Sequence, residues 1–343
     1  MNNSADQWNR REFSRGVALA GAAGLLGLGP EQVLAESPPE TTTLKLQRPV
    51  TTLPGVCVAP QLVAEDLLKA EGFTDIRYVA TGTSQRSRGL AGGEIDLTMG
   101  FVGTWIKQVD AGDPIVILTG VHVGCFQLFA SERIRTILDL KGKTIGVTEL
   151  GSSRHVFLVS LLSYVGLNPS KDVTLVTQPP AESVNLFAAG KLDAYQAFAE
   201  EVEELRARQI GHVIMSSTEE RPWSRYFCCM LAGNREFVRK HPIATKRAVR
   251  AILKASSVCA LEPERVTRLL IDRKFTTAQY EYVRNTIQSL PYTKWREYEP
   301  EDTVRFYALR LHEIGMIKST PTTIIGQATD WRFLNELKKE LKG

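Results

Sequence analysis

Long apolar segments and an excess of one charge are both missing from this chain of 343 residues. The apolar run VALAGAAGLLGLG, residues 17–29, is shorter than the roughly 20 residues that a membrane-spanning helix needs. The formal net charge is only +4, and no Lys/Arg run with interleaved aromatic residues occurs, so no nucleic-acid partner is expected. With 43% hydrophobic and 23% charged residues, the composition is that of an ordinary globular protein that buries a core.

Signatures of catalysis and of metal binding are also scarce. The sequence has no G-x-S-x-G elbow, which removes one common signal of a hydrolase. No cysteine pair forms C-x-x-C, and no histidine stands out at metal-ligating spacing from a cysteine, so no metal site is predicted. An odd number of cysteines leaves at least one free thiol. We interpret most of the five as small buried apolar residues: Cys57, Cys125, Cys228, Cys229 and Cys259.

The N-terminal residues are typical of an export signal. The pair Arg10-Arg11 precedes the mild, Gly/Ala-rich apolar run, and Ala35 offers a small residue for cleavage. This order predicts a twin-arginine signal peptide over residues 1–35 and therefore a periplasmic protein, with a soluble amphipathic N-terminus as the alternative. Its removal would leave the net charge at +4, and residues 36–43 are predicted to be a linker.

Predicted strands and helices alternate in two series. Between Leu44 and about Ile134, strand-like runs such as DIRYVATG and PIVILTGVHVG alternate with helical patterns such as PQLVAEDLLKAEGF. A second series begins with the strand KTIGVTE and the helix SSRHVFLVSLLSYVGL, and the region after Leu231 is predicted to be helical. The alternation predicts an α/β fold of βαβ units with mostly parallel sheets.

The second series is predicted to form a lobe inserted in the first. The first lobe would take residues 44–130 and return as a helical segment over 231–343, and the second would take 131–230. The chain would cross between the lobes near 126–134 and 225–233. Such an arrangement leaves a cleft that the ends of strands and the starts of helices face.

The order of several short motifs resembles a known family. The motifs are AGGEIDLTMG, AGDPIVILTG, IRTILDLKGKTIGV, GSSRH, YVGLNPSKDVTLV and AAGKLDAY, in that order. The set is similar to the nitrate/sulfonate/taurine-type substrate-binding proteins of ABC importers, from about Leu44 to the C-terminus. The resemblance implies a type II periplasmic-binding-protein fold, in which two α/β lobes joined by two crossing strands close on a small ligand and a helical C-terminal tail follows.

The strongest local candidate for ligand contact is the segment Gly151-Ser152-Ser153-Arg154-His155. It follows the strand Thr144–Val147 and opens a helix, and a helix N-terminus offers backbone N–H groups and a favourable dipole to an anion. Ser152 or Ser153 is also a normal N-cap, Arg154 would add charge or point to solvent, and His155 would be a cleft donor or a core residue.

Other candidates follow the remaining strands at the predicted cleft. Gly55 permits close backbone approach in a first loop that contacts ligand in the family, where Cys57 is either a contact or a packing thiol. The rest offer hydroxyl, amide or aromatic groups near strand ends, and Trp223 would be a lid or only a packing residue. They are Thr83, Ser84, Phe101, Thr104, Tyr195, Gln196, Phe198 and Trp223.

The predicted function is capture of a small organic anion or polar aromatic ligand by hinge closure, without a cofactor and without chemistry on this chain. The resemblance implies the permease and ATPase subunits of an ABC importer as partners, and a monomer is expected. An alternative is an enzyme similar to the thiamine-pyrimidine synthases, which share the fold. That enzyme needs a Schiff-base lysine and a first-loop histidine, and TTLPGVCVAPQL contains neither. A ligand-binding sensor for a membrane receptor is a further alternative.

Overall fold

The structure is a computed structural model that describes residues 36–50 and 55–341. The predicted signal peptide, residues 1–35, lies outside the described residues. From Pro38 onward the chain forms one compact unit. Among the described residues, no helix has the length and apolarity that crossing a membrane requires.

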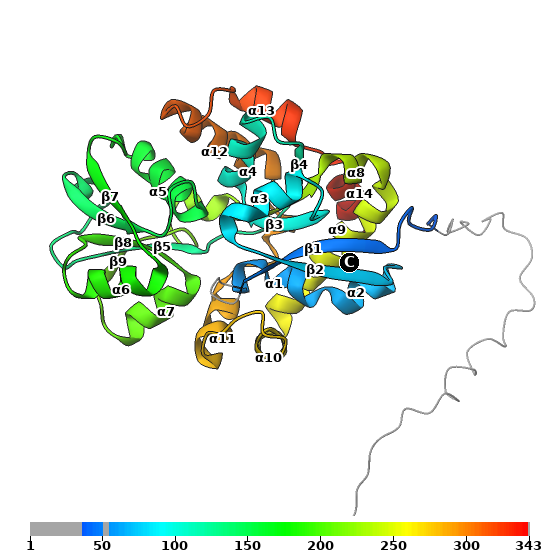
Figure 1. Ribbon diagram of the computed structural model, residues 1–343, viewed down its shortest axis with the longest axis horizontal. Helices are drawn as coiled ribbons and strands as arrows, with labels where there is room; N and C mark the ends of the chain where they lie inside the picture. The colour runs from blue at the N-terminus through cyan, green and yellow to red at the C-terminus, as the bar shows by residue number, and fades with distance from the viewer. Residues whose placement is uncertain (1–35, 51–54, 342–343) are drawn as a thin grey trace, which may run out of the picture. The chain divides into compact units, whose positions relative to one another are not determined.

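Two five-stranded mixed sheets organise this unit (Figure 1). The first sheet has the strand order β2-β1-β3-β10-β4, and the second has the order β7-β6-β8-β5-β9. The strands of the first sheet are β1 (Thr43–Pro49), β2 (Asp75–Thr81), β3 (Leu97–Phe101), β4 (Ile115–His122) and β10 (Cys229–Asn234). The strands of the second sheet are β5 (Phe126–Ala130), β6 (Lys143–Val147), β7 (Val173–Thr177), β8 (Ala194–Phe198) and β9 (His212–Ser216).

The predicted fold class, two α/β lobes joined by crossing connections, is confirmed. The sheets are more mixed than predicted, because β10 runs antiparallel to β3 and β4, and β5 runs antiparallel to β8 and β9. Each of these strands enters its sheet from the other lobe and therefore runs against its neighbours. The crossings fall at residues 123–125 and 217–228, so β5, which the predicted boundary at 130 put in the first lobe, lies in the second sheet.

Helices cover the faces of both sheets. In the first lobe, α1 and α2 replace the one helix predicted there, because the chain interrupts it at Ala64. The helix α7 in the second lobe was not predicted. The helices up to the second crossing are α1 (Ala59–Val63), α2 (Glu65–Ala70), α3 (Thr83–Ala91), α4 (Val102–Asp110), α5 (Ser153–Tyr164), α6 (Pro180–Ala188) and α7 (Ala199–Ala207).

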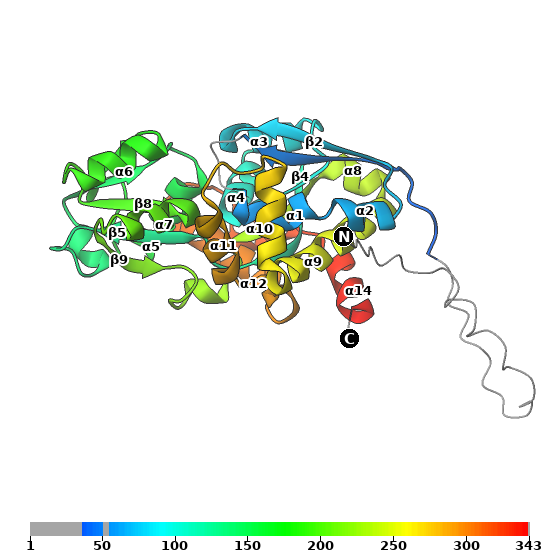
Figure 2. The same cartoon turned by 90° about the horizontal axis from the view of Figure 1, so that it is seen from below.

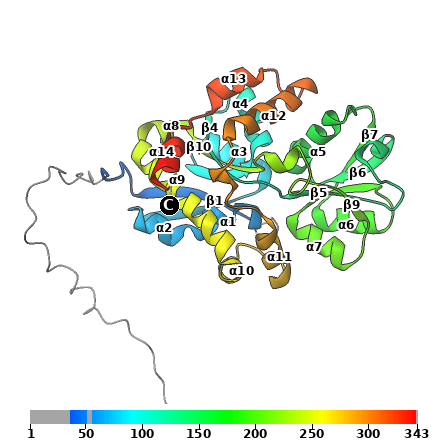
Figure 3. The ribbon, with the colours of Figure 1, turned by 180° about the vertical axis from the view of Figure 1, so that it is seen from behind.

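After β10 the chain is helical, as predicted, and stays with the first lobe. Helices α10 and α11 lie beside α1 and the short 3-10 helix Val56–Val58 (Figure 2), and α14 packs on α9 (Figure 3). Asn234 caps the first of these helices by accepting hydrogen bonds from the N–H groups of Glu236 and Phe237. The helices are α8 (Arg235–Lys240), α9 (Pro242–Leu261), α10 (Pro263–Asp272), α11 (Tyr280–Ser289), α12 (Pro300–Glu313), α13 (Pro321–Ala328) and α14 (Arg332–Glu340).

One apolar core runs from the first lobe into the second. Aromatic rings join the two parts: Phe101 at the end of β3 packs edge-on against Phe126 of β5 and Phe157 of α5. The opposite face of the second sheet has a separate cluster around Phe129 and Phe187. The base of the interlobe region is therefore packed with aromatic side chains.

Candidate functional site

A cavity of about 900 Å³ lies between the two lobes. The second lobe provides most of the wall, from the loops that follow β6 and β7, and the first lobe contributes Val50 and Gly82. Three helices begin at this cavity, namely α3 after Gly82, α5 after Ser152 and α6 after Pro179. The lining residues are Val50, Gly82, Thr148, Glu149, Leu150, Ser152, Ser153, Arg154, Thr177, Gln178, Pro179, Pro180 and Ala181.

The start of α5 is built by its own turn. Ser152 is the N-cap, and its hydroxyl accepts a hydrogen bond from the N–H of His155 at 3.4 Å and donates one to the Glu149 carbonyl at 2.6 Å. Gly151 precedes it with φ +82°, a conformation that favours glycine. Ser152 thus has the capping role considered from the sequence, and both serines also line the cavity.

Arg154 lines the cavity and is held in place by a buried ion pair. Its guanidinium contacts the carboxylate of Glu201 in α7 and donates to the Thr148 hydroxyl at 3.2 Å. It also lies 5.0 Å from the centre of the Phe198 ring. The side chain of Arg154 is 6% exposed and that of Glu201 is 12% exposed. The charge of Arg154 is therefore balanced within the protein, and its first role is to position the α5 N-terminus.

A second, cationic cavity of about 300 Å³ shares the α5 N-terminus with the first. Leu150, Ser152 and Ser153 line both cavities. The second is also lined by three positively charged side chains of the first lobe, Arg86, Arg88 and Lys107. The helix N-terminus therefore faces hydroxyl groups and the Glu149 side chain on one side and three cations on the other, and the cations and the helix dipole favour negative charge.

His155 lies one turn into α5, half-buried, and its ring contacts the loop before the helix. Its Nδ1 accepts a hydrogen bond from the Gly151 N–H at 3.0 Å. Burial lowers the pKa of His155 below its ordinary value, and the charge of Lys107 lowers it further. The imidazole is thus held neutral, as an acceptor that fixes the loop.

We expect this histidine to make stability depend on pH. Because its pKa is lower in the folded state, the unfolded chain takes up the proton first, and stability falls as pH drops below about 6.5 toward the folded pKa. Urea unfolding at a series of pH values measures the slope. His155→Asn keeps an acceptor for Gly151 but cannot titrate, so it should flatten the slope in this window. An unchanged slope in the variant would contradict the assignment.

Three predicted aromatic contacts are packed into the interlobe core. Phe101 is 3%, Phe198 is 8% and Trp223 is 3% exposed. Trp223 packs edge-on against Phe157 and Phe306, and Phe198 packs against Phe126. None of the three lines the 900 Å³ cavity, although Phe101 also lines the cationic cavity. Trp223 thus has the packing role of the two considered from the sequence.

The other predicted contacts are divided between the cavities and the core. Thr104 lines the cationic cavity and donates to the Phe101 carbonyl at 2.6 Å. Gly55 is buried, where an added Cβ would lie 2.7 Å from the Phe275 carbonyl oxygen. Tyr195 and Gln196 are fully buried in β8. The side chains of Thr83 and Ser84 lie outside what the structure describes, although both residues belong to the start of α3.

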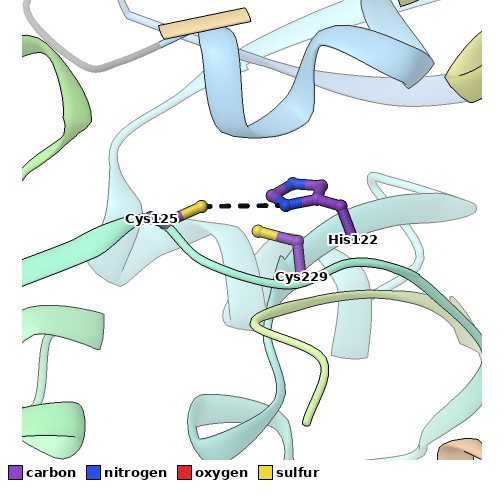
Figure 4. Close-up of side chains that lie close together, drawn as sticks. All are labelled: His122, Cys125 and Cys229. Carbon is purple, nitrogen blue, oxygen red and sulfur yellow. Dashed lines mark hydrogen bonds between the residues drawn. The ribbon is translucent and has the colours of Figure 1, made fainter. Parts of the chain in front are cut away.

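Cys57, the remaining candidate, belongs to a buried cluster of thiols near a histidine. Its Sγ lies 2.8 Å from that of Cys125, and Nε2 of His122 lies 2.8 Å from its carbonyl oxygen. Figure 4 shows His122, Cys125 and Cys229 with their side chains turned toward one another. The statement that no histidine lies at metal-ligating spacing from a cysteine is therefore wrong: His122 and Cys125 are three residues apart and approach to 3.9 Å.

Several lining residues were missed, although a signal for them exists. Thr177, Gln178 and Pro179 follow the strand β7 and lead into α6, just as Ser152 leads from β6 into α5. The sequence VTQPPAES carries this strand end and a proline-marked helix start. The end of β7 and the start of α6 could therefore have been predicted to lie at the cavity together with the start of α5.

Comparison with known structures defines the fold class. The periplasmic nitrate-binding protein NrtA of Synechocystis PCC 6803 superposes with a TM-score of 0.74 at 15% identity, over 89% of this chain and 90% of that chain. The periplasmic sulfonate-binding protein SsuA of Methylobacillus flagellatus KT superposes with a TM-score of 0.67 at 19% identity, over 88% and 94%. At these identities the likeness shows the fold of periplasmic binding proteins.

The sequence itself places the chain in a family. Residues 37–269 match the NMT1-like family, and the chain belongs to this family. The bicarbonate transport ATP-binding protein CmpC of Synechocystis sp. (strain ATCC 27184 / PCC 6803 / Kazusa) is 27% identical over 257 residues, which are 67% of this chain and 38% of that protein. The chain spans less than two thirds of the length of the first relatives that it matches.

Proposed function

We propose that the chain is a solute-binding protein of an ABC importer, which captures a small organic anion in the cavity between its lobes. The observation that carries this proposal is the convergence of three helix N-termini, those of α3, α5 and α6, on one 900 Å³ cavity. Helix N-termini present unpaired backbone N–H groups and partial positive charge to a ligand.

The composition of the wall supports an anion that also has an organic part. Thr148, Ser153 and Gln178 offer hydrogen-bonding groups, whereas Leu150 and the pair Pro179-Pro180 offer apolar surface. The neighbouring cationic cavity adds Arg86 and Lys107 at the other side of the α5 N-terminus. A carboxylate or sulfonate with a short carbon skeleton matches this mixture better than a bare inorganic ion.

The mechanism follows from the position of the cavity. A ligand that touches Gly82 of the first lobe and Ser153 of the second makes more contacts when the lobes are closed, so binding favours the closed form. The closed form then docks on a permease whose ATPase subunit drives transport. We also propose that a twin-arginine signal peptide exports the chain and that the protein is periplasmic and monomeric. These proposals rest on the sequence of residues 1–35 and on the fold.

A thermal-shift screen tests the proposal. The purified chain is scanned against sulfonates, aromatic carboxylates, nitrate, bicarbonate and neutral pyrimidines at matched ionic strength. A ligand present at 100 times its Kd should stabilise the protein by about 2.7 kcal/mol, which is a shift of a few degrees. We expect a hit among the organic anions. A panel in which only neutral compounds stabilise the protein would refute the anion, and bound pyridoxal phosphate in the purified protein would favour the enzyme alternative.

A further inference from the structure

Four of the five cysteines meet at one place in the first lobe, although they are far apart in the sequence. Cys57 comes from the 3-10 helix Val56–Val58, Cys125 from the first crossing, Cys228 from the end of the second crossing and Cys229 from the start of β10. The sulfurs of Cys57 and Cys125 lie 2.8 Å apart, and the potential ligand atoms of Cys125 and Cys229 lie within 4.8 Å of each other. Cysteines that only pack in the apolar core need not lie next to one another.

His122 completes the cluster and is oriented as a ligand would be. It is the last residue of β4 and pairs with Cys229 across the β4–β10 ladder. Its Nε2 donates to the Cys57 carbonyl at 2.8 Å, and its Nδ1 lies 3.9 Å from the Cys125 sulfur, which it could approach by giving up its nearer backbone contact (Figure 4). Histidines that bind metals commonly donate the other ring N–H to a backbone carbonyl in this way. Nδ1 also lies 3.0 Å from the Val123 carbonyl, a contact that metal binding would replace.

Cys125 is held in an unusual backbone conformation that turns its thiol into the cluster. Its φ is +92°, and the preceding Gly124 has φ +89°. A residue with a side chain rarely adopts this region, and such outliers concentrate at functional sites. The crossing between the lobes thus bends sharply at the point where it delivers a cysteine to His122 and Cys229.

We propose that His122, Cys125 and Cys229 bind one thiophilic divalent metal ion, with Zn²⁺ as the expected ion. The potential ligand atoms of these three residues lie within 4.8 Å of one another. Tetrahedral Zn²⁺, with bonds of about 2.3 Å to sulfur and about 2.0 Å to nitrogen, needs ligand atoms roughly 3.5–4 Å apart. Cys57 lies outside this group of three, but its sulfur is 2.8 Å from that of Cys125, so Cys57 is the nearest candidate for a fourth ligand once its side chain moves.

The chemistry of the cluster suits a soft metal ion. Metal binding would release the thiol protons to solvent. Sulfur and imidazole ligands without a carboxylate select zinc or copper(I) over magnesium or calcium.

The position of the cluster determines which elements a bound ion would connect. Cys125 also lines a small cavity of about 80 Å³ together with Thr218 and Leu290. A bound ion would connect the Val56–Val58 turn, the end of β4, the first crossing and β10. We therefore assign it a structural role at the base of the crossing, separate from the ligand cavity.

The test measures metal binding directly on the full chain, purified with a tag that contains no histidines and reduced under anaerobic conditions. Addition of Co²⁺ should produce a thiolate-to-cobalt charge-transfer band and the intense visible bands of a tetrahedral ion, saturating at one ion per chain, and Zn²⁺ should abolish both. Zn²⁺ should also raise the Tm. Cys125→Ser and Cys229→Ser should each weaken Zn²⁺ binding at least about 100-fold.

Cys259→Ser is the matched control, because Cys259 is equally buried in α9 but lies outside the metal-ligand set. It should bind Co²⁺ with unchanged spectra. The wild-type spectrum decides the proposal even where a variant fails to fold. Absence of the charge-transfer band in reduced wild-type protein would overturn it, as would equal spectra in wild type and Cys229→Ser.

Discussion

Replacing Arg154 by methionine is expected to destabilise the protein by about 3–5 kcal/mol. The substitution removes the cation from a buried pair and leaves the Glu201 carboxylate, which is 12% exposed, without its counter-charge. Among the described residues, Glu201 would keep the hydrogen bond that it accepts from the Phe198 N–H at 2.8 Å, and that bond does not balance a buried charge. The free energy of unfolding, from urea titrations at pH 7, measures the loss.

Two further variants separate the ion pair from the loss of side-chain volume. The double variant Arg154→Met/Glu201→Gln removes both charges and should be clearly more stable than the sum of the single losses predicts. Arg208→Met is the control on the same part of the second lobe. Its partner Glu204 lies 2.8 Å away, but both side chains are more than 40% exposed, so the change should stay within about 1 kcal/mol. Equal losses for Arg154→Met and Arg208→Met would contradict the account.

Truncation of Phe157 to alanine is expected to cost about 3–5 kcal/mol and to disturb the contact between the lobes. The ring stacks on Phe126 with 4.3 Å between centroids and packs edge-on against Phe101 and Trp223. Because Phe101 belongs to the first lobe and Phe157 to the second, the lost contacts include some that hold the lobes together. The expected result is a lower urea midpoint together with weaker binding of the screened ligand.

A control distinguishes this role from general core packing. Phe187 is also a buried phenylalanine, at 5% exposure, but it belongs to the separate cluster on the outer face of the second sheet. Phe187→Ala should lose similar stability and, measured under conditions where it is folded, keep the ligand affinity. The milder pair Phe157→Leu and Phe187→Leu serves if the alanine variants do not fold. Affinity that falls equally in both members of the pair would contradict a special role for Phe157.

The fold was largely predictable because its strands and helices have strong local patterns. The run Thr144–Val147 forms β6, and the serine after the following loop caps α5, as the sequence suggested. The break at Ala64 and the helix α7 carry weaker patterns and were not predicted. The strands β5 and β10 belong to different sheets. Which sheet each of them joins depends on pairing between distant segments, and a pattern of apolar residues does not encode that pairing.

The residues of the candidate site were predictable only where the local backbone conformation determines the position of the side chain. Ser152 and Ser153 line the cavity because a helix begins there, and that start was visible in the sequence. The aromatic residues Phe101, Phe198 and Trp223 follow strand ends or a crossing in the same way, yet they turn into the core. Whether an apolar ring at a strand end faces a cavity or a neighbouring ring is decided by tertiary packing.

The thiol cluster also depends on tertiary packing. Cys57, Cys125 and Cys229 lie on three elements that only the complete fold brings together. Interpreting them as buried apolar residues agrees with their burial, but no sequence pattern specifies the distances between them. The short spacing from His122 to Cys125 was the one local signal.

The affinity of the best organic anion for wild type and for Ser153→Asp, measured by calorimetric titration, decides whether an anion binds between the lobes. An acidic residue in the first turn of α5 favours the helix dipole, so Ser153→Asp should not lower the Tm. The same carboxylate lies at the wall of the cavity and repels an anion bound there. The account predicts one ligand per chain and an affinity at least about tenfold weaker in the variant, a difference of about 1.4 kcal/mol. Equal affinities for the two proteins would contradict an anion site between the lobes.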